Sequence, residues 1–394
     1  MKLYLKYFYL FLLYTWTIVD IITGYNLHNE NLVLLNFAQI LRSVLLLLSI
    51  LIIFLKSNGK ELKLILVITF ILILLFLKIF YYKFPYDFFY TQVKMFSWIF
   101  NIYAIYILFT SKLISVSNIN IALKINFILI MLNIVLAYFG FGYSKYGESE
   151  DGNIIGSIGY FYSGNELNSA LFLCFSIFYY KTRYNFKRFL YFSFFFLIIT
   201  FATLSKSIIG GYFFVTLLAL FLLHKKLNFK TFAILLSIFF ILLISLSNIS
   251  YINLYIESFK FLYDRTDSIF EFISNGRNLR FEVFTASNYF NNPLNILIGT
   301  YFSESGIFTF EMDYLDIFFY NGILGLILIF LCWKLYFTLI SKCINTTEKK
   351  FISYVLFFFN LIAFFAGHTI YSQMSLLFLI IILVLTYDYQ NKIV

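Results

Sequence analysis

Charged residues are scarce in this 394-residue chain, where Asp, Glu, Lys and Arg together make up 12%. A soluble domain is about one quarter charged, because its surface must be hydrated. Hydrophobic residues account for 62% of the chain. Apolar runs recur along its whole length, and a helix of ~20 such residues crosses the ~30 Å hydrocarbon core of a bilayer. The lack of charge therefore excludes a water-soluble globule and predicts an integral membrane protein.

Cysteine and histidine are also rare, with three of each. Two of the cysteines lie in apolar runs, so no disulfide framework is predicted. The histidines and cysteines show no metal-ligand spacing. The sequence contains no phosphate-binding P-loop and no dinucleotide-binding fingerprint. We therefore expect no metal, no cofactor and no use of ATP.

The formal net charge of +10 comes from basic residues spread over short loops. This spread argues against a nucleic-acid partner and is typical of loops retained in the cytoplasm by their Lys and Arg. With both termini inside, a model of twelve spans places all the basic loops on one side. The predicted spans are residues 3–23, 32–55, 62–81, 95–111, 120–141, 165–180, 188–204, 207–223, 231–247, 313–333, 351–367 and 371–388. We expect an all-α, polytopic helix bundle in the cell (inner) membrane, with residues 1–394 as one integral membrane domain and both termini cytoplasmic.

Two segments outside the membrane stand out by length. A minor extracytoplasmic loop is predicted at residues 142–164, and a major one at 248–312 between spans nine and ten. Long loops in compact proteins are commonly functional or disordered, and the aromatic content of the major loop favours order. There is no internal repeat and no matched pair of broken spans, which counts against an inverted-repeat transporter.

Three basic residues are candidates for binding an anion on the outer side. Lys206 lies between two central spans, where it either meets an anionic group or is a snorkelling lysine at a tight turn. Arg277 and Arg280 lie in the major loop and share one face if the segment is helical. Their guanidinium groups suit phosphate oxygens, although they can equally pair with acids of the same loop.

Three acids open the tenth predicted span: Glu311, Asp313 and Asp316. Acids in a first helical turn are favoured by the helix dipole, which is the structural explanation. Asp316 lies where the apolar run begins, and a carboxylate there is costly and usually has a purpose. A carboxylate beside a hydroxyl acceptor can act as a general base.

Four further polar residues are candidates. His368 lies at the outer end of span eleven and is either a structural hydrogen-bonding group or a catalyst. Asn165 and Glu166 open span six, where an N-cap followed by an acid is the structural explanation. Arg42 lies well inside span two, so it must be paired or line a wet cavity.

Tyrosines on the outer face form a separate group of candidates. They either stack on sugar rings or belong to an aromatic belt at the membrane interface. The residues concerned are Tyr160, Tyr162, Tyr289 and Tyr301.

Five segments, in this order, carry a resemblance to a known family: residues 159–168, 203–207, 274–280, 311–325 and 367–369. They resemble motifs of the O-antigen ligase/polymerase superfamily, and within it the Wzy-type polymerases of O-antigens and capsules. A large late outer loop in a dozen spans is similar as well. The fifth segment, with its Gly-His pair, resembles a motif near the end of some capsular members.

The resemblance implies transfer of a glycan from undecaprenyl pyrophosphate to a hydroxyl of another lipid-linked repeat unit, without a metal or a nucleotide sugar. It implies that Arg277, Arg280 and Lys206 hold the pyrophosphate. It leaves Asp313, Glu311 and His368 as alternatives for the base. Ligases of this superfamily often show a His-Asn pair before the late span. This sequence departs from that pattern, because Asp313 stands there instead, and the departure weakens the ligase interpretation.

The expected partners are the lipid-linked oligosaccharide, the bilayer and a chain-length regulator. An O-antigen ligase is the alternative enzyme. A flippase for the same lipid-linked units is the alternative from another class, and Arg42 fits it best. A sensor or scaffold would need a soluble signalling module, which the sequence lacks.

Overall fold

The computed structural model describes residues 2–29, 32–56, 59–82, 86–145, 156–225, 288–300, 311–341 and 346–391. Within these ranges the chain is almost entirely helical. The α-helices are α1 (Lys2–His28), α2 (Leu32–Lys56), α3 (Lys60–Tyr82), α4 (Tyr86–Thr110), α5 (Val116–Ala137), α6 (Gly164–Lys181), α7 (Phe186–Thr203), α8 (Lys206–Leu218), α13 (Pro293–Ile298), α14 (Asp313–Ile340), α15 (Thr346–Phe365) and α16 (Gln373–Asn391). A π-helical turn, η1 (Ala219–Leu223), extends α8, and a 3-10 turn, η2 (Asn288–Asn291), precedes α13.

The observed helices follow the apolar runs of the sequence. Within the described ranges, helices coincide with eleven of the twelve predicted spans, and the predicted span 231–247 lies outside those ranges. In the same part of the chain, six helices are long and apolar enough to cross a membrane: α1, α4, α5, α7, α8 continued by η1, and α14. The all-α bundle of membrane type is therefore confirmed, while twelve spans remains a prediction. Helix α4 begins at Tyr86, well before the predicted start at residue 95.

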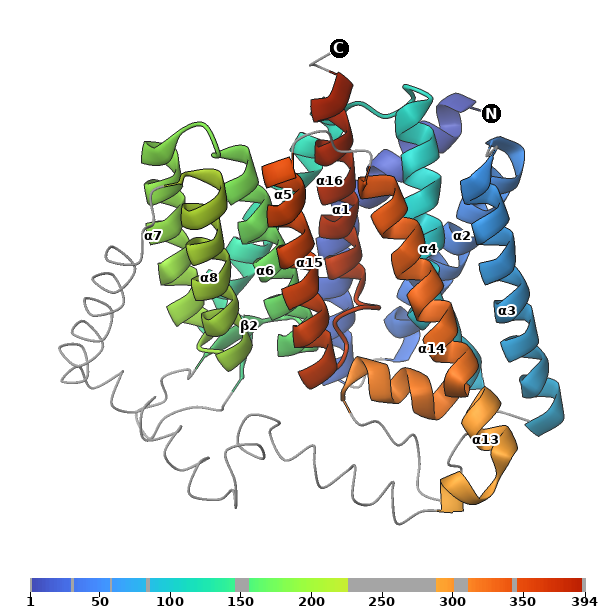
Figure 1. Ribbon diagram of the computed structural model, residues 1–394. Helices are drawn as coiled ribbons and strands as arrows, with labels where there is room; N and C mark the ends of the chain where they lie inside the picture. Colours follow the sequence, from blue (N-terminus) through green and yellow to red (C-terminus); the bar gives the residue numbers. More distant parts are fainter. Residues whose placement is uncertain are drawn as a thin grey trace.

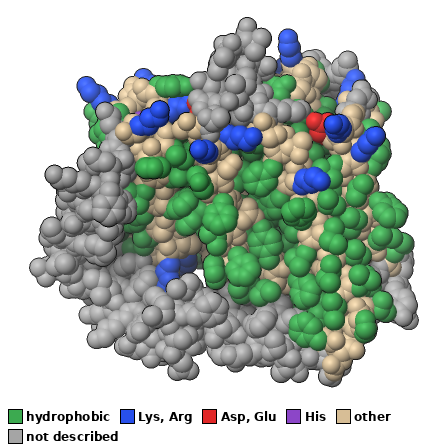
Figure 2. Space-filling view, in the orientation of Figure 1, with side chains coloured by type: hydrophobic (Ala, Val, Ile, Leu, Met, Phe, Trp, Pro, Cys, Tyr) green, Lys and Arg blue, Asp and Glu red, His purple; other side chains and the backbone are tan. Residues whose placement is uncertain are grey.

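The bundle has two distinct ends. Both termini lie at one end (Figure 1). Figure 2 shows Lys and Arg side chains gathered mainly along that end, with a broad band of hydrophobic side chains beyond it. We call it the basic end, and we call the opposite end, which carries the β-strands, the hairpin end. The positive-inside rule predicts that the basic end faces the cytoplasm.

Large apolar side chains cover the outside of the bundle. Phe70 of α3, Phe194 of α7 and Phe330 of α14 are 61%, 68% and 67% exposed. In water such a surface would cost about 25 cal/mol for each Å² of apolar area. A hydrocarbon solvent removes that cost, so the exterior supports a bilayer setting. The interior is centred on α4, where Trp98, Ile99 and Ile102 are inaccessible to solvent.

A small β-hairpin lies in the predicted minor loop. Strand β1 (Tyr143–Ser144) pairs antiparallel with β2 (Ser157–Gly159). The predicted fold class did not include this hairpin. It packs against α1, because a Cβ atom on Gly24 would lie 2.0 Å from the Tyr160 carbonyl oxygen. Only glycine allows such a close approach of the two backbones.

Helix α14 is bent at Gly322, which adopts φ 59° and ψ −156°. Residues 313–321 lie across the hairpin end, and the rest of α14 rises towards the basic end (Figure 1). Helix α13 packs into the bend, since a Cβ atom on Gly322 would lie 2.5 Å from the Leu297 carbonyl oxygen. The Thr300 N–H also donates to the Phe319 carbonyl at 2.9 Å. The predicted span 313–333 lies within a helix that is long and apolar enough to cross a membrane, but its bend at Gly322 was not predicted.

Candidate functional site

The Asp313 carboxylate holds the loop between α15 and α16. Its Oδ1 accepts a hydrogen bond from the His368 backbone N–H at 2.5 Å. Its Oδ2 accepts from the backbone N–H groups of Thr369 and Ile370, each at 2.8 Å, and from the Thr369 hydroxyl at 2.5 Å. Asp313 is inaccessible to solvent. A buried carboxylate with this many donors fixes the backbone around it, here the segment that carries His368.

Two residues beside this carboxylate have strained backbones. Glu311 has φ 56° and His368 has φ 66°, a region that residues other than glycine seldom adopt. They belong to touching segments, because a Cβ atom on Gly367 would lie 2.4 Å from the Glu311 carbonyl carbon. Such strain persists only where the surroundings impose it, and it is concentrated at functional sites. The structure thus brings together Glu311, Asp313 and His368.

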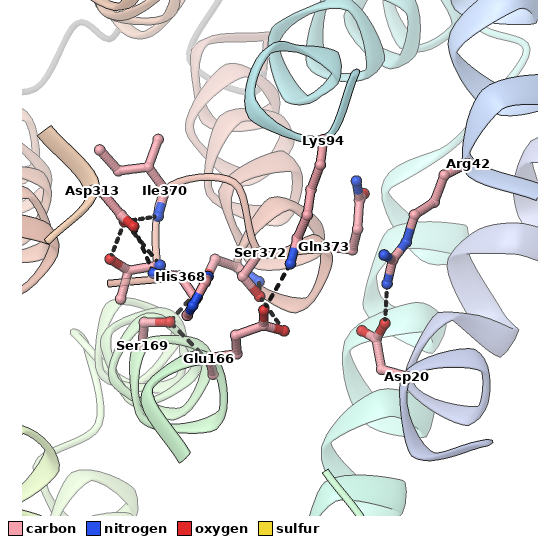
Figure 3. Close-up of polar contacts among 12 residues, drawn as sticks. Asp20, Arg42, Lys94, Glu166, Ser169, Asp313, His368, Ile370, Ser372 and Gln373 are labelled. Atoms are coloured by element: carbon pink, nitrogen blue, oxygen red, sulfur yellow. Dashed lines mark hydrogen bonds and ion pairs between the residues drawn. The ribbon is translucent and has the colours of Figure 1, made fainter. Parts of the chain in front are cut away.

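An ion pair lies next to His368. Lys94 of α4 and Glu166 of α6 approach to 3.2 Å between Nζ and Oε1. Figure 3 shows His368 between the Asp313 carboxylate and this pair. The Ser372 hydroxyl donates to Glu166 Oε2 at 3.5 Å, and Lys94 lies over the Tyr371 ring, 5.7 Å from its centroid. We call Lys94, Glu166, Glu311, Asp313 and His368 the His368 cluster.

The imidazole of His368 is the side chain of this cluster that is best suited to accept a proton. Its Nδ1 is buried and has no hydrogen-bond partner among the described residues. Burial lowers the pKa of His368, and the nearby Lys94 cation lowers it further, against the opposing influence of Glu166 and Asp313. A lowered pKa keeps the imidazole neutral at pH 7, the form that can accept a proton.

Asn165 and Asp316 lie at helix starts. Asn165 is in the first turn of α6 beside Glu166, but the N-cap is Ser163. Asp316 is buried, and its Oδ2 accepts from the Met312 backbone N–H at 3.3 Å. That contact, at the N-terminus of α14, is the role expected from the helix dipole.

Arg42 has an ionic partner inside the bundle. Its Nη2 lies 3.1 Å from Oδ1 of Asp20 on α1, and both side chains are buried. Figure 3 shows this pair beside the Lys94–Glu166 pair, with Gln373 between Lys94 and Arg42. Pairing accounts for a cation at this depth, because an isolated buried charge is far more costly than a paired one.

Lys206 belongs to a second polar group at the hairpin end, which we call the Lys206 cluster. It occupies the first position of α8, and its neighbour Ser205 is the N-cap but makes no side-chain capping bond. Ser205 Oγ instead accepts from Lys145 Nζ at 2.7 Å and from the Asn168 amide at 2.6 Å. The amide also donates to Ser207 at 3.1 Å. The cluster thus combines two lysines with the N–H groups of a helix N-terminus. Asn168, which joins it to α6, lies two residues after Glu166.

Some predicted site residues lie outside the described part of the chain. Arg277, Arg280 and Tyr301 are among them, so their positions relative to either cluster stay predictions. The described residues contain no group of three His, Cys, Asp or Glu side chains that could hold a metal ion.

Sequence reasoning missed Lys94, Asp20 and Lys145. A signal existed for two of them. Lys94 was placed just outside a span predicted to begin at residue 95, although α4 begins at Tyr86. Asp20 is an acid inside the first predicted span and was the obvious partner for Arg42. Lys145 had no signal, because it is one of several charged residues in its loop.

The chain was compared with protein-family models, with curated proteins and with solved structures, and no match was found in any of the three.

Proposed function

We propose that this protein is a polysaccharide polymerase that acts at the hairpin end of the bundle, on the extracytoplasmic face of the membrane. It would transfer undecaprenyl-pyrophosphate-linked glycan onto a lipid-linked repeat unit. The observation that carries the proposal is the His368 cluster, in which Asp313 holds the backbone of His368 and places this histidine beside the Lys94–Glu166 pair. Burial lowers the pKa of its imidazole. Four segments distant in sequence converge there.

His368 is the proposed general base. Its imidazole takes the proton from a sugar hydroxyl of the acceptor unit, and that oxygen attacks the anomeric carbon of the donor glycan. A new C–O bond forms as the bond from that carbon to the pyrophosphate oxygen breaks. The pyrophosphate leaves with the electron pair, and the proton remains on His368 until it passes to water. A base positioned in this way contributes typically 10²–10⁴-fold to a rate.

Asp313 is the proposed positioning residue for His368. Both of its carboxylate oxygens already accept hydrogen bonds from the loop. A base must have an oxygen free to receive the substrate proton, so this arrangement favours His368 over Asp313. Glu311 is the alternative base, since it is only partly buried and adjoins Gly367.

The Lys206 cluster is the proposed site for the pyrophosphate. A helix N-terminus presents backbone N–H groups and a positive dipole end to an anion. Helix α8 begins at Lys206, and Lys145 donates to its N-cap residue, Ser205. Fixed cations stabilise the charge that develops on a departing pyrophosphate. Arg277 and Arg280 of the major loop are proposed to complete this site.

A flippase for lipid-linked oligosaccharide is the second candidate. The observation that favours it is two ionic contacts inside the bundle, the buried Arg42–Asp20 pair and the partly buried Lys94–Glu166 pair. Charged residues inside a membrane protein often mark a transport path. An O-antigen ligase remains the enzyme alternative.

The proposal is tested with the purified full-length protein in liposomes that contain the lipid-linked repeat unit. The wild-type protein should convert single units into a ladder, and His368→Ala should leave them unreacted. His224→Phe is the matched control, because His224 packs against Phe189 and lies after η1, away from the cluster. Ladder formation by His368→Ala at the wild-type rate would overturn the assignment of the base. Movement of units across the bilayer without polymer would support the flippase.

A further inference from the structure

Five aromatic rings gather at the hairpin end. Tyr25 and His28 come from the last turns of α1, Tyr143 from β1, and Tyr160 and Tyr162 from the segment after β2. The His28 and Tyr143 rings are 3.8 Å apart between centroids, and Tyr160 meets Tyr25 at 5.4 Å and Tyr143 at 5.5 Å, both edge to face. His28 also lies 6.1 Å from Tyr162. We call these five residues the aromatic platform.

The platform is built on closely packed backbone. Tyr160 donates its backbone N–H to the Asn133 side chain at 3.1 Å. A Cβ atom on Gly159 would lie 2.4 Å from that same side chain, so the turn below the rings is tightly fitted to α5. Tyr162 is followed, four residues later, by Glu166 of the His368 cluster. The platform is therefore held in place and lies four residues along the chain from the proposed catalytic site.

The rings combine open apolar faces with polar edges. Tyr25 and Tyr162 are 49% and 58% exposed. The Asn29 amide approaches the Tyr143 hydroxyl at 3.5 Å, and His28 adds ring nitrogens to the same surface. Lipid chains do not require such polar groups. Two phenylalanines in the turn after α5, Phe139 and Phe141, are also exposed but their side chains carry no polar atom.

A pyranose ring matches this surface. One face of the sugar presents C–H groups, which are attracted to the negative face of an aromatic ring, and its rim presents hydroxyls, which need hydrogen-bond partners. We infer that the aromatic platform binds a sugar ring of the lipid-linked glycan by stacking, next to the sugar that reacts at His368. This inference rests on the proposed function. Binding energy from such a remote part of the substrate helps to orient the reacting centre.

The test is binding of a soluble oligosaccharide to the full-length protein in nanodiscs, measured by isothermal titration calorimetry. The oligosaccharide is released by mild hydrolysis from the polysaccharide of the strain that encodes the protein. Tyr162→Leu and Tyr25→Leu should each weaken binding by roughly five- to tenfold, because they keep apolar bulk but lose the ring. Tyr162→Phe should keep affinity within about twofold, since the stacking face remains.

Phe139→Leu and Phe141→Leu are the matched controls for lipid contact and should leave oligosaccharide affinity unchanged. Wild-type affinity in both Tyr→Leu variants, an equal loss in the Phe→Leu controls, or no binding to the wild-type protein would each overturn the platform. The proposed reaction is judged separately by polymer formation. If wild-type protein binds the oligosaccharide through these tyrosines but never polymerises, the platform stands and the proposed function fails.

Discussion

Asp313 and Thr369 are joined twice: Oδ2 of the carboxylate accepts from the Thr369 backbone N–H at 2.8 Å and from its hydroxyl at 2.5 Å. The contact fastens the start of α14 to the loop that precedes α16. Because His368 is the residue before Thr369, this contact sets where its imidazole lies. The proposed catalytic site therefore depends on a structural carboxylate.

Graded substitutions at this contact should separate positioning from catalysis. Thr369→Val removes one hydroxyl bond and should cost about 1 kcal/mol of stability. Asp313→Asn leaves backbone donors without an acceptor and should cost about 2–3 kcal/mol and abolish polymer. Thermal unfolding in detergent and polymer yield at matched protein levels measure the two effects. Full polymer from Asp313→Asn would show that the loop does not need this carboxylate.

The pH dependence of polymerisation should report the state of His368. Burial and Lys94 lower the pKa of its imidazole. The neutral, active form should therefore persist below the usual pKa of about 6.5, and activity should be lost only at still lower pH. Lys94→Met removes a cation, so the pKa of His368 should rise and the acid limb should move to higher pH. Initial rates in liposomes between pH 5 and 8 measure this shift. Lys225→Met is the variant that should leave the limb in place, because Lys225 is exposed and follows η1, outside both clusters.

The Arg42–Asp20 pair should behave as a structural unit if the protein is an enzyme. Asp20→Leu or Arg42→Met alone leaves an unpaired buried charge and should cost about 3–5 kcal/mol. The double variant removes both charges and should recover most of that stability and the polymer ladder. A double-mutant cycle of thermal stability and polymer yield tests this. A stable double variant without product would favour a transport role for the pair.

The bend in α14 should depend on glycine at position 322. Gly322→Ala forces a side chain into a positive φ and towards the Leu297 carbonyl, so it should lower stability by about 2 kcal/mol or more. Gly210→Ala in α8 is the control, because a Cβ atom there has no atom within 4 Å. Melting temperatures of the two variants should differ clearly, and equal stability would contradict the bend.

The helices could be predicted from the sequence because a long apolar run is itself the physical cause of a membrane helix. The bend at Gly322 could not, since a glycine inside an apolar run permits a bend without requiring one, and the contact with α13 that accompanies it is not visible in the sequence. The start of α4 at Tyr86 could not be predicted either. Its first turns are polar enough to resemble a loop, and this concealed Lys94 as a partly buried cation within a helix.

The candidate site was only partly predictable. Asp313, His368 and Glu166 were each noted as anomalies in their own segments. Their grouping was not visible, because Asp313 and His368 are 55 residues apart in the sequence and are brought together by the tertiary fold. The role of Asp313 as holder of a loop depends on four hydrogen-bond donors, and no spacing rule in the sequence reveals those.

The most direct test of the central proposal is the surface glycan of a strain that lacks the gene, resolved on a gel. The deletion strain is compared alone and with a plasmid that encodes either the wild-type protein or His368→Ala. We expect a full polysaccharide ladder with the wild-type gene, and single repeat units at the surface in the other two cases. A full ladder in the deletion strain, long lipid-linked chains that never leave the carrier, or units trapped inside the cell would contradict a polymerase.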